Sequence, residues 1–228
     1  MNYFAHGREF VFDPYFLAGT AVPDWLSVVD RPTRIRSRQA LEHIDAGDPC
    51  LAAVARGIAR HLHDDGWFHA TRAFAELSLE LTRRARCHLA EEAGFRPHFI
   101  GHILVEILLD AELIAADPGR LEAYYGALDR LDADRVAQAV GRMGRGGGQR
   151  LAVFIPLFSR ERFLWDYLDD GKLMFRLNQV MRRVKLPALP ADFGSLLPAA
   201  RCQVAERQAE LLACPAGFEH PSPVVPRT

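Results

Sequence analysis

The sequence has few cysteines and no closely spaced pair of them. Its four cysteines lie at positions 50, 87, 202 and 214 and form no Cys-x-x-Cys motif. This spacing argues against a structural zinc knuckle and against a dense disulfide framework. We therefore expect a reducing, cytoplasmic environment.

Long apolar runs and an excess of charge of either sign are also missing. The most apolar stretch, residues 99–114, contains His102, Glu106, Asp110 and Glu112, so we expect no membrane-spanning helix. The first nine residues lack the basic start and apolar core of a signal peptide. With 28 basic and 29 acidic residues the formal net charge is -1. This balance gives no strong signal for binding nucleic acid or a membrane surface.

Strand patterns are scarce, whereas helical periodicity is common. No segment alternates apolar and polar residues over a useful length. The predicted helices lie near residues 50–72, 71–92, 98–115, 118–128, 132–144, 159–183 (one helix or a pair, with a hinge near Gly171) and 196–213. The sequence predicts an all-α protein, with one compact multi-helix domain over residues 1–213 and a metal site between helices. Residues 214–228 are rich in proline, and we expect them to form a disordered tail.

Histidines and carboxylates recur four residues apart in two of the predicted helices. The two series are His61, Asp65 and His69, and His102, Glu106 and Asp110. Residues four apart lie one turn apart on the same helix face, and each step drifts by about 40°. Each series can therefore place nitrogen and oxygen donors around one or two ions.

The second series interrupts a stretch made otherwise of isoleucine, leucine and valine. Burying the carboxylates of Glu106 and Asp110 there is costly unless a partner neutralises them. A cation is the simplest partner, and mixed imidazole and carboxylate ligands suit zinc, manganese or iron. The alternative partners are the guanidinium groups of Arg83, Arg84 and Arg183.

Other candidate ligands also have structural interpretations. His6 lies close to the N-terminus, where a lone histidine is more often structural than a ligand. Asp24 follows Pro23 and fits the N-cap of a helix. His63 and Asp64 fit a solvated helix face. The metal hypothesis therefore depends on the two series together with His6 and Asp24.

Five segments follow one another in an order that resembles a known family. They are residues 1–6 (MNYFAH), residues 17–25, residues 57–65 with Gly-Ile before His-x-x-x-Asp, Asp110, and residues 162–183. This order resembles the acyl carrier protein phosphodiesterases, which are HD-like helical metal hydrolases. The chain departs from the family after Asp110, where alanine replaces a histidine that is common there.

A second resemblance depends on the order of seven histidine and acidic residues. An early His and an Asp are followed by a His-x-x-x-Asp with a further His, and then by a His-x-x-x-Glu. These residues are His6, Asp24, His61, Asp65, His69, His102 and Glu106. Their order is similar to that in the zinc-dependent phospholipases C and the single-strand-specific zinc nucleases, although the N-terminal tryptophan of those enzymes is missing here. Both groups cleave phosphodiesters with metal-activated water. The resemblances imply a phosphodiester-containing substrate, with a carrier protein as one candidate partner.

We therefore expect a metal-dependent phosphodiesterase or related phosphoric-ester hydrolase that uses zinc or manganese. The expected ligands are His6, Asp24, His61, Asp65, His69, His102, Glu106 and Asp110. Asp65 or Asp110 would act as the catalytic base, and Arg60 or Arg183 would stabilise charge on phosphorus. Two alternatives stay open: a non-haem iron oxygenase on the same type of site, and a non-catalytic helical interaction module. The oligomeric state does not follow from the sequence.

Overall fold

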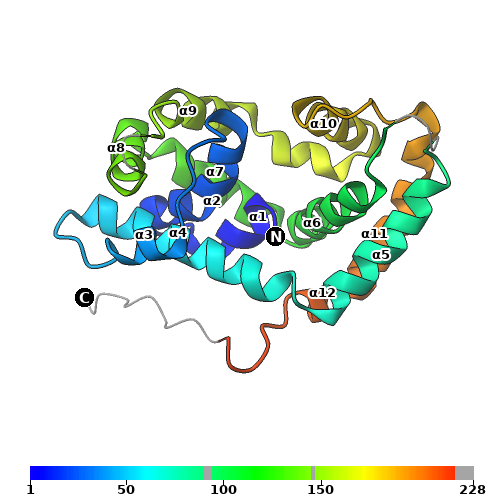
Figure 1. Ribbon diagram of the computed structural model, residues 1–228, viewed down its shortest axis with the longest axis horizontal. Helices are drawn as coiled ribbons and strands as arrows, with labels where there is room; N and C mark the ends of the chain where they lie inside the picture. The colour runs from blue at the N-terminus through cyan, green and yellow to red at the C-terminus, as the bar shows by residue number, and fades with distance from the viewer. Residues whose placement is uncertain (90–93, 145–146, 219–228) are drawn as a thin grey trace. The chain divides into compact units, whose positions relative to one another are not determined.

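A computed structural model describes residues 1–89, 94–144 and 147–218 of the chain (Figure 1). Every regular element within these ranges is a helix, which confirms the predicted all-α class. Among the described helices, none combines the length and apolarity needed to cross a membrane.

The described residues divide into two compact units. The first unit comprises Met1–Ala5, Phe68–Leu121 and Arg162–Ala213. The second comprises His6–Trp67, Glu122–Glu161 and residues 214–218. The single domain over residues 1–213 stays a prediction, and residues 219–228 of the predicted tail lie outside the described residues.

The first unit is built around α5 (Arg72–Arg86) and α6 (Pro97–Ala116), which pack side by side (Figure 1). Its other elements are η3 (Phe163–Leu168), α10 (Asp170–Arg183), η4 (Ala191–Leu196), α11 (Leu197–Glu206) and α12 (Gln208–Leu211). At Gly101 a Cβ atom would overlap the Thr82 hydroxyl and the Ser78 carbonyl of α5. The missing side chain therefore lets α5 and α6 approach closely, just before His102.

The second unit contains the helices within residues 6–67 and 122–161. Its elements are η1 (Arg8–Phe10), α2 (Pro14–Val29), α3 (Ser37–Leu41), α4 (Pro49–Phe68), α8 (Ala133–Met143) and α9 (Leu151–Glu161). Helices α1 (Tyr3–Gly7) and α7 (Pro118–Asp129) contribute residues to both units, as does α4 through its last residue, Phe68.

Helices α2 and α4 meet at a pair of glycines. A Cβ atom on Gly19 would overlap the Val54 carbonyl, and one on Gly57 would overlap the Phe16 carbonyl. The two helices can therefore pack with their backbones in contact only while both positions lack a side chain. This contact fixes the position of Thr20, which follows Gly19, relative to His61, which lies one turn after Gly57.

Helix α2 corrects two expectations from the sequence. No helix was predicted over residues 14–29, yet α2 spans them and contains Pro23. Its N-cap is Asp13, whose carboxylate accepts from the Phe16 amide at 3.1 Å. Asp24 lies inside the helix, so its predicted role as an N-cap is wrong.

The helix or helix pair predicted over residues 159–183, with its hinge near Gly171, is also divided differently. Helix α9 begins at Leu151 and ends at Glu161, and Arg162 follows with a positive φ of 45°. Helix α10 begins after Asp169, whose carboxylate accepts from the Lys172 amide at 2.8 Å. The breaks therefore come from a left-handed residue and a capping aspartate, and Gly171 lies within the first turn of α10.

Candidate metal centres

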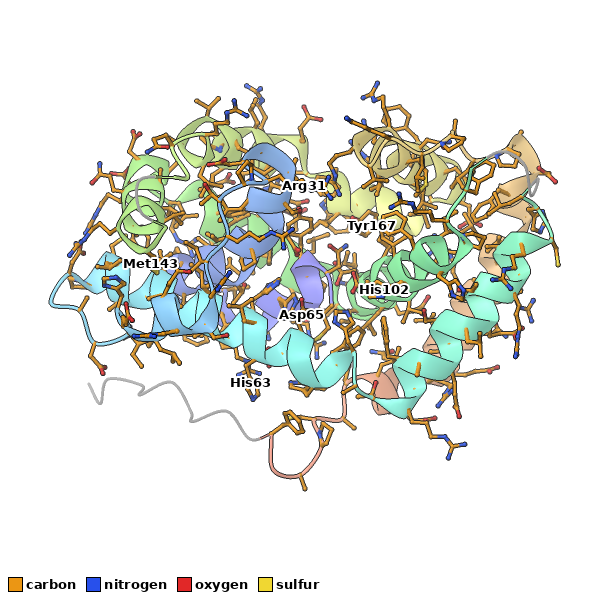
Figure 2. The ribbon with its side chains drawn as sticks, in the orientation of Figure 1. Arg31, His63, Asp65, His102, Met143 and Tyr167 are labelled. Carbon is orange, nitrogen blue, oxygen red and sulfur yellow. The ribbon has the colours of Figure 1, made fainter. Side chains whose placement is uncertain are left out.

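Imidazole and carboxylate donors gather in two groups among the described residues, one within each unit. The buried group consists of His6, His61 and Asp65, and the half-exposed group consists of His69, His102 and Glu106. In each group the candidate ligand atoms all lie within 4.8 Å of one another. Figure 2 labels Asp65 of the buried group on α4 and His102 of the half-exposed group on α6.

In the buried group, α1 contributes His6 and α4 contributes His61 and Asp65. The Nε2 atom of His6 lies 3.1 Å from Asp65 Oδ1, and that of His61 lies 3.4 Å from Asp65 Oδ2. The two imidazole rings stack with centroids 4.0 Å apart. Both side chains are almost fully buried, whereas the Asp65 carboxylate is 31% exposed and provides the solvent access.

The orientation of His61 is set by α2. Its Nδ1 lies 2.8 Å from the carbonyl oxygen of Thr20, which can only accept a hydrogen bond. Nδ1 therefore carries a proton, and Nε2 is left to face Asp65. Metal-binding histidines are commonly held by this arrangement, in which a carbonyl fixes the tautomer and aims the other nitrogen at the ion.

Burial and the neighbouring groups together set the charges in the buried group. Burial, with the neighbouring His61, lowers the pKa of His6 to about 3, so His6 is neutral near pH 7. Burial opposes charge on His61, but Asp65 and Asp24 raise its pKa. Burial likewise opposes charge on Asp65, yet His6 and His61 lower the pKa of that carboxyl.

The contacts within this group are compatible with a bound metal ion. A neutral His61 would aim the lone pair of Nε2 at a carboxylate oxygen, which is repulsive unless a proton or a metal ion lies between them. His6 Nδ1 is also buried without a hydrogen-bond partner among the described residues. The hydrogen bonds within the protein thus leave the group incompletely satisfied.

In the half-exposed group, two imidazoles converge on one carboxylate oxygen. His69 follows α4, and its Nε2 lies 2.7 Å from Glu106 Oε1; the corresponding distance for His102 is 3.2 Å. The buried ring of Phe74 contacts both imidazoles edge-on, with centroids 4.8 and 4.9 Å away. Phe74 therefore keeps both rings turned toward Glu106.

Glu106 also lies near a third basic group, since the amino group of Met1 is 3.4 Å from its Oε1. Burial opposes ionisation of Glu106, but this amino group and the two imidazoles hold its pKa well below the usual range. The carboxylate is therefore charged near neutral pH and suited to bind a cation. Arg83 and Arg84, considered from the sequence as alternative partners, lie beside Glu80 instead.

Two predicted ligands lie outside both groups. Asp24 is close enough to His61 to raise its pKa, but it is not among the clustered donors. Asp110 is fully buried, and its two oxygens accept from the backbone amides of Phe4 and Ala5 at 3.0 and 2.7 Å. Burial raises the pKa of Asp110 to about 7.

The two predicted substrate-binding arginines are Arg60 on α4 and Arg183 on α10. Arg60 donates to Asp64 Oδ2 at 2.6 Å and stacks over the Phe10 ring. Asp64 is buried and also accepts from the indole of Trp67, so its predicted place on a solvated face is wrong. Arg183 is exposed at the last position of α10.

Three supporting contacts were not foreseen from the sequence. They are the Thr20 carbonyl behind His61, the Phe74 ring beside His69 and His102, and the two amides that bind Asp110. Backbone groups carry no residue-type signal, so only the glycines at positions 19 and 57 hinted at the first contact.

Comparison with models of known protein families, with curated proteins and with solved structures finds no match to this chain. The resemblances drawn from the motif order therefore stay hypotheses.

Proposed function

We propose that the protein is a metal-dependent hydrolase of phosphoric esters, with phosphodiesters as the expected substrates. The observation that carries the proposal is the orientation of His61. Its Nδ1 is occupied by the Thr20 carbonyl, and its Nε2 faces Asp65 in a buried group that also holds a neutral His6. Such a set of two imidazoles and one carboxylate suits zinc or manganese.

The chain's own residues define where a cation would be held. His6 and His61 offer nitrogen donors, and Asp65 offers the carboxylate that balances the charge. In the half-exposed group the same donor types come from His69, His102 and Glu106. When bound, a divalent ion lowers the pKa of a coordinated water and neutralises phosphate oxygens.

Asp65 is the residue best placed to handle a proton. Its carboxylate is partly exposed and remains ionised, so it can accept a hydrogen bond from water or orient that water toward phosphorus. Asp110 is fully buried, with both oxygens bound to backbone amides, and is not placed for this role. Among the two carboxylates expected from the sequence to act as base, the geometry favours Asp65.

The experiment is elemental analysis of the purified full chain after incubation with zinc or manganese and desalting. His61→Ala and Glu106→Ala each remove a central donor of one group, and we expect each to lower the metal content. His63→Ala on α4 and His98→Ala on α6 are matched controls, since neither histidine belongs to a group. We expect both controls to retain the metal of the unaltered protein.

Activity is then measured on the metal-loaded protein with a chromogenic phosphodiester. Hydrolysis that is lost in His61→Ala and kept in His63→Ala supports the proposal. Metal content that is unchanged in both donor variants, or a loaded protein that hydrolyses no phosphoric ester, overturns it. Iron as the retained metal would redirect the search to oxygen chemistry.

A further inference from the structure

A fully buried carboxylate holds the beginning of α1. Asp110 of α6 is 0% exposed, and its two oxygens each accept one backbone hydrogen bond, from the amides of Phe4 and Ala5. These amides belong to the first turn of α1, where backbone N–H groups have no partner within the helix. Asp110 therefore caps α1 from a different helix.

The cap matters because α1 is only five residues long. A helix of this length has almost no stability of its own and keeps its shape only through contacts made by its residues. His6 directly follows Ala5, so the backbone that Asp110 binds also sets the direction in which the His6 imidazole leaves the helix.

The chemistry of Asp110 indicates a dedicated role. A buried carboxylate is costly, and an apolar residue would fill the same space without that cost. What only the carboxylate provides is a pair of strong acceptors aimed at two adjacent amides. Those acceptors bind the turn of α1 that precedes His6, which is a candidate ligand. Asp110 itself is not among the candidate ligands of the buried group.

We propose that Asp110 is a positioning residue that orients His6 through the backbone of α1. The proposal rests on the proposed function in one respect, since it assigns the oriented imidazole to metal binding. Asp110 itself takes no part as a ligand or as a base. It acts on the site only through the Phe4 and Ala5 amides.

The first test is zinc affinity, measured on the full chain by competition with a chromogenic chelator. Asp110→Asn keeps the size of the side chain but turns one acceptor into a donor that faces an amide. We expect zinc affinity to fall by about 10–100-fold, the usual effect of removing a group that orients a ligand. Asp169→Asn is the matched control, because Asp169 caps α10, which carries no clustered donor.

A double-mutant cycle separates positioning from general damage to the protein. If Asp110 acts through His6, Asp110→Asn should cause no further loss of zinc affinity in a His6→Ala background. Ala5→Pro provides an independent variant, since it removes one donor and leaves Asp110 unchanged; proline is tolerated in the first turn of a helix. We expect the same loss of affinity from it. An additive loss in the His6→Ala background, or an equal loss in Asp169→Asn, overturns the proposal.

A readout that needs no metal distinguishes failure of this proposal from failure of the proposed function. Nitrogen-15 spectra of the histidine side chains report the tautomer and environment of His6, assigned with His6→Ala. We expect the His6 signals to move in Asp110→Asn and to stay in place in Asp169→Asn. Unchanged His6 signals in Asp110→Asn overturn the positioning role, whether or not the protein binds zinc. Moved signals in a protein that binds no metal support the positioning and reject the hydrolase.

Discussion

His61 donates a hydrogen bond from Nδ1 to the carbonyl oxygen of Thr20 over 2.8 Å, beside the contact between α2 and α4. The two residues are 41 positions apart. Their separation is set by Gly19, which precedes Thr20, and by Gly57, which lies one turn before His61. The glycine contact and the orientation of the imidazole are therefore parts of one arrangement.

Gly57→Ala should disturb both the packing of α2 against α4 and the orientation of the His61 imidazole. The new Cβ would overlap the Phe16 carbonyl, which is backbone and cannot turn away. We expect the free energy of unfolding to fall by about 1–3 kcal/mol, the usual cost of overpacking, even though alanine favours a helix by about 1 kcal/mol. Urea denaturation checks the stability, and zinc binding checks the His61 orientation.

Gly66→Ala on the same helix is the control, because nothing lies within 4 Å of its added Cβ. It should leave zinc binding unchanged and should not lower the free energy of unfolding. Equal effects of the two substitutions would contradict the role given to the glycine contact.

The helices that carry the ligands were predicted well because their patterns are strong. Apolar residues at helical spacing place the beginnings of α4, α5 and α6, and the end of α6, within one residue of the observed bounds, whereas α4 and α5 end earlier than predicted, at Phe68 and Arg86. Helix α2 was missed because Pro23 interrupts its pattern, and proline is normally excluded from the interior of a helix. The division into two units depends on contacts between distant segments, which no local pattern reports.

The candidate site shows the same contrast. The four-residue spacings placed His61 with Asp65, and His102 with Glu106, since one turn of helix brings these pairs together. The same spacing suggested that Asp110 joins them, but spacing does not reveal a competing partner. In the fold, the amides of α1 occupy both Asp110 oxygens.

The free energy of unfolding should decrease in acid because of the buried His6 imidazole. The pKa of His6 falls from 6.5 to about 3 because the ring is buried. Between these values the unfolded chain binds a proton that the folded protein does not, so stability decreases as the pH falls below 6.5. One pKa unit corresponds to about 1.4 kcal/mol, which gives about 2 kcal/mol between pH 6.5 and pH 5.

Other groups in the site add to this dependence with different signs. Asp65 has a lowered pKa, so its contribution is present above pH 3.8 and is lost as the pH falls further. His61 has a raised pKa, so it opposes His6 and stabilises the folded state at lower pH. The informative quantity is therefore the difference between the unaltered protein and His6→Gln, measured by urea unfolding with a chelator present. A fall in stability from pH 7 to pH 5 that is as large in His6→Gln as in the unaltered protein would refute the assignment.

Arg60 should matter for stability more than for substrate. Its guanidinium pairs with Asp64, a buried carboxylate that would lose its charged partner in Arg60→Ala. Because Arg60 itself is partly exposed, we expect a loss of about 1–2 kcal/mol in the free energy of unfolding. With a phosphodiester substrate, the KM of Arg60→Ala should stay close to that of the unaltered protein. A large rise in KM at unchanged stability would instead place Arg60 in substrate binding.

Metal should stabilise the folded protein through each group separately. An ion that binds only the folded state adds about 2.7 kcal/mol at a free concentration of 100 times its Kd. We expect the Tm to rise with zinc concentration and to return to its starting value with a chelator. Asp65→Asn removes the carboxylate from the buried group, and Glu106→Gln removes it from the half-exposed group. Each variant should therefore lose part of the zinc-dependent rise, and the double variant should lose nearly all of it. A rise that survives in the double variant would show that zinc binds elsewhere, since no donor set with a carboxylate would remain in either group.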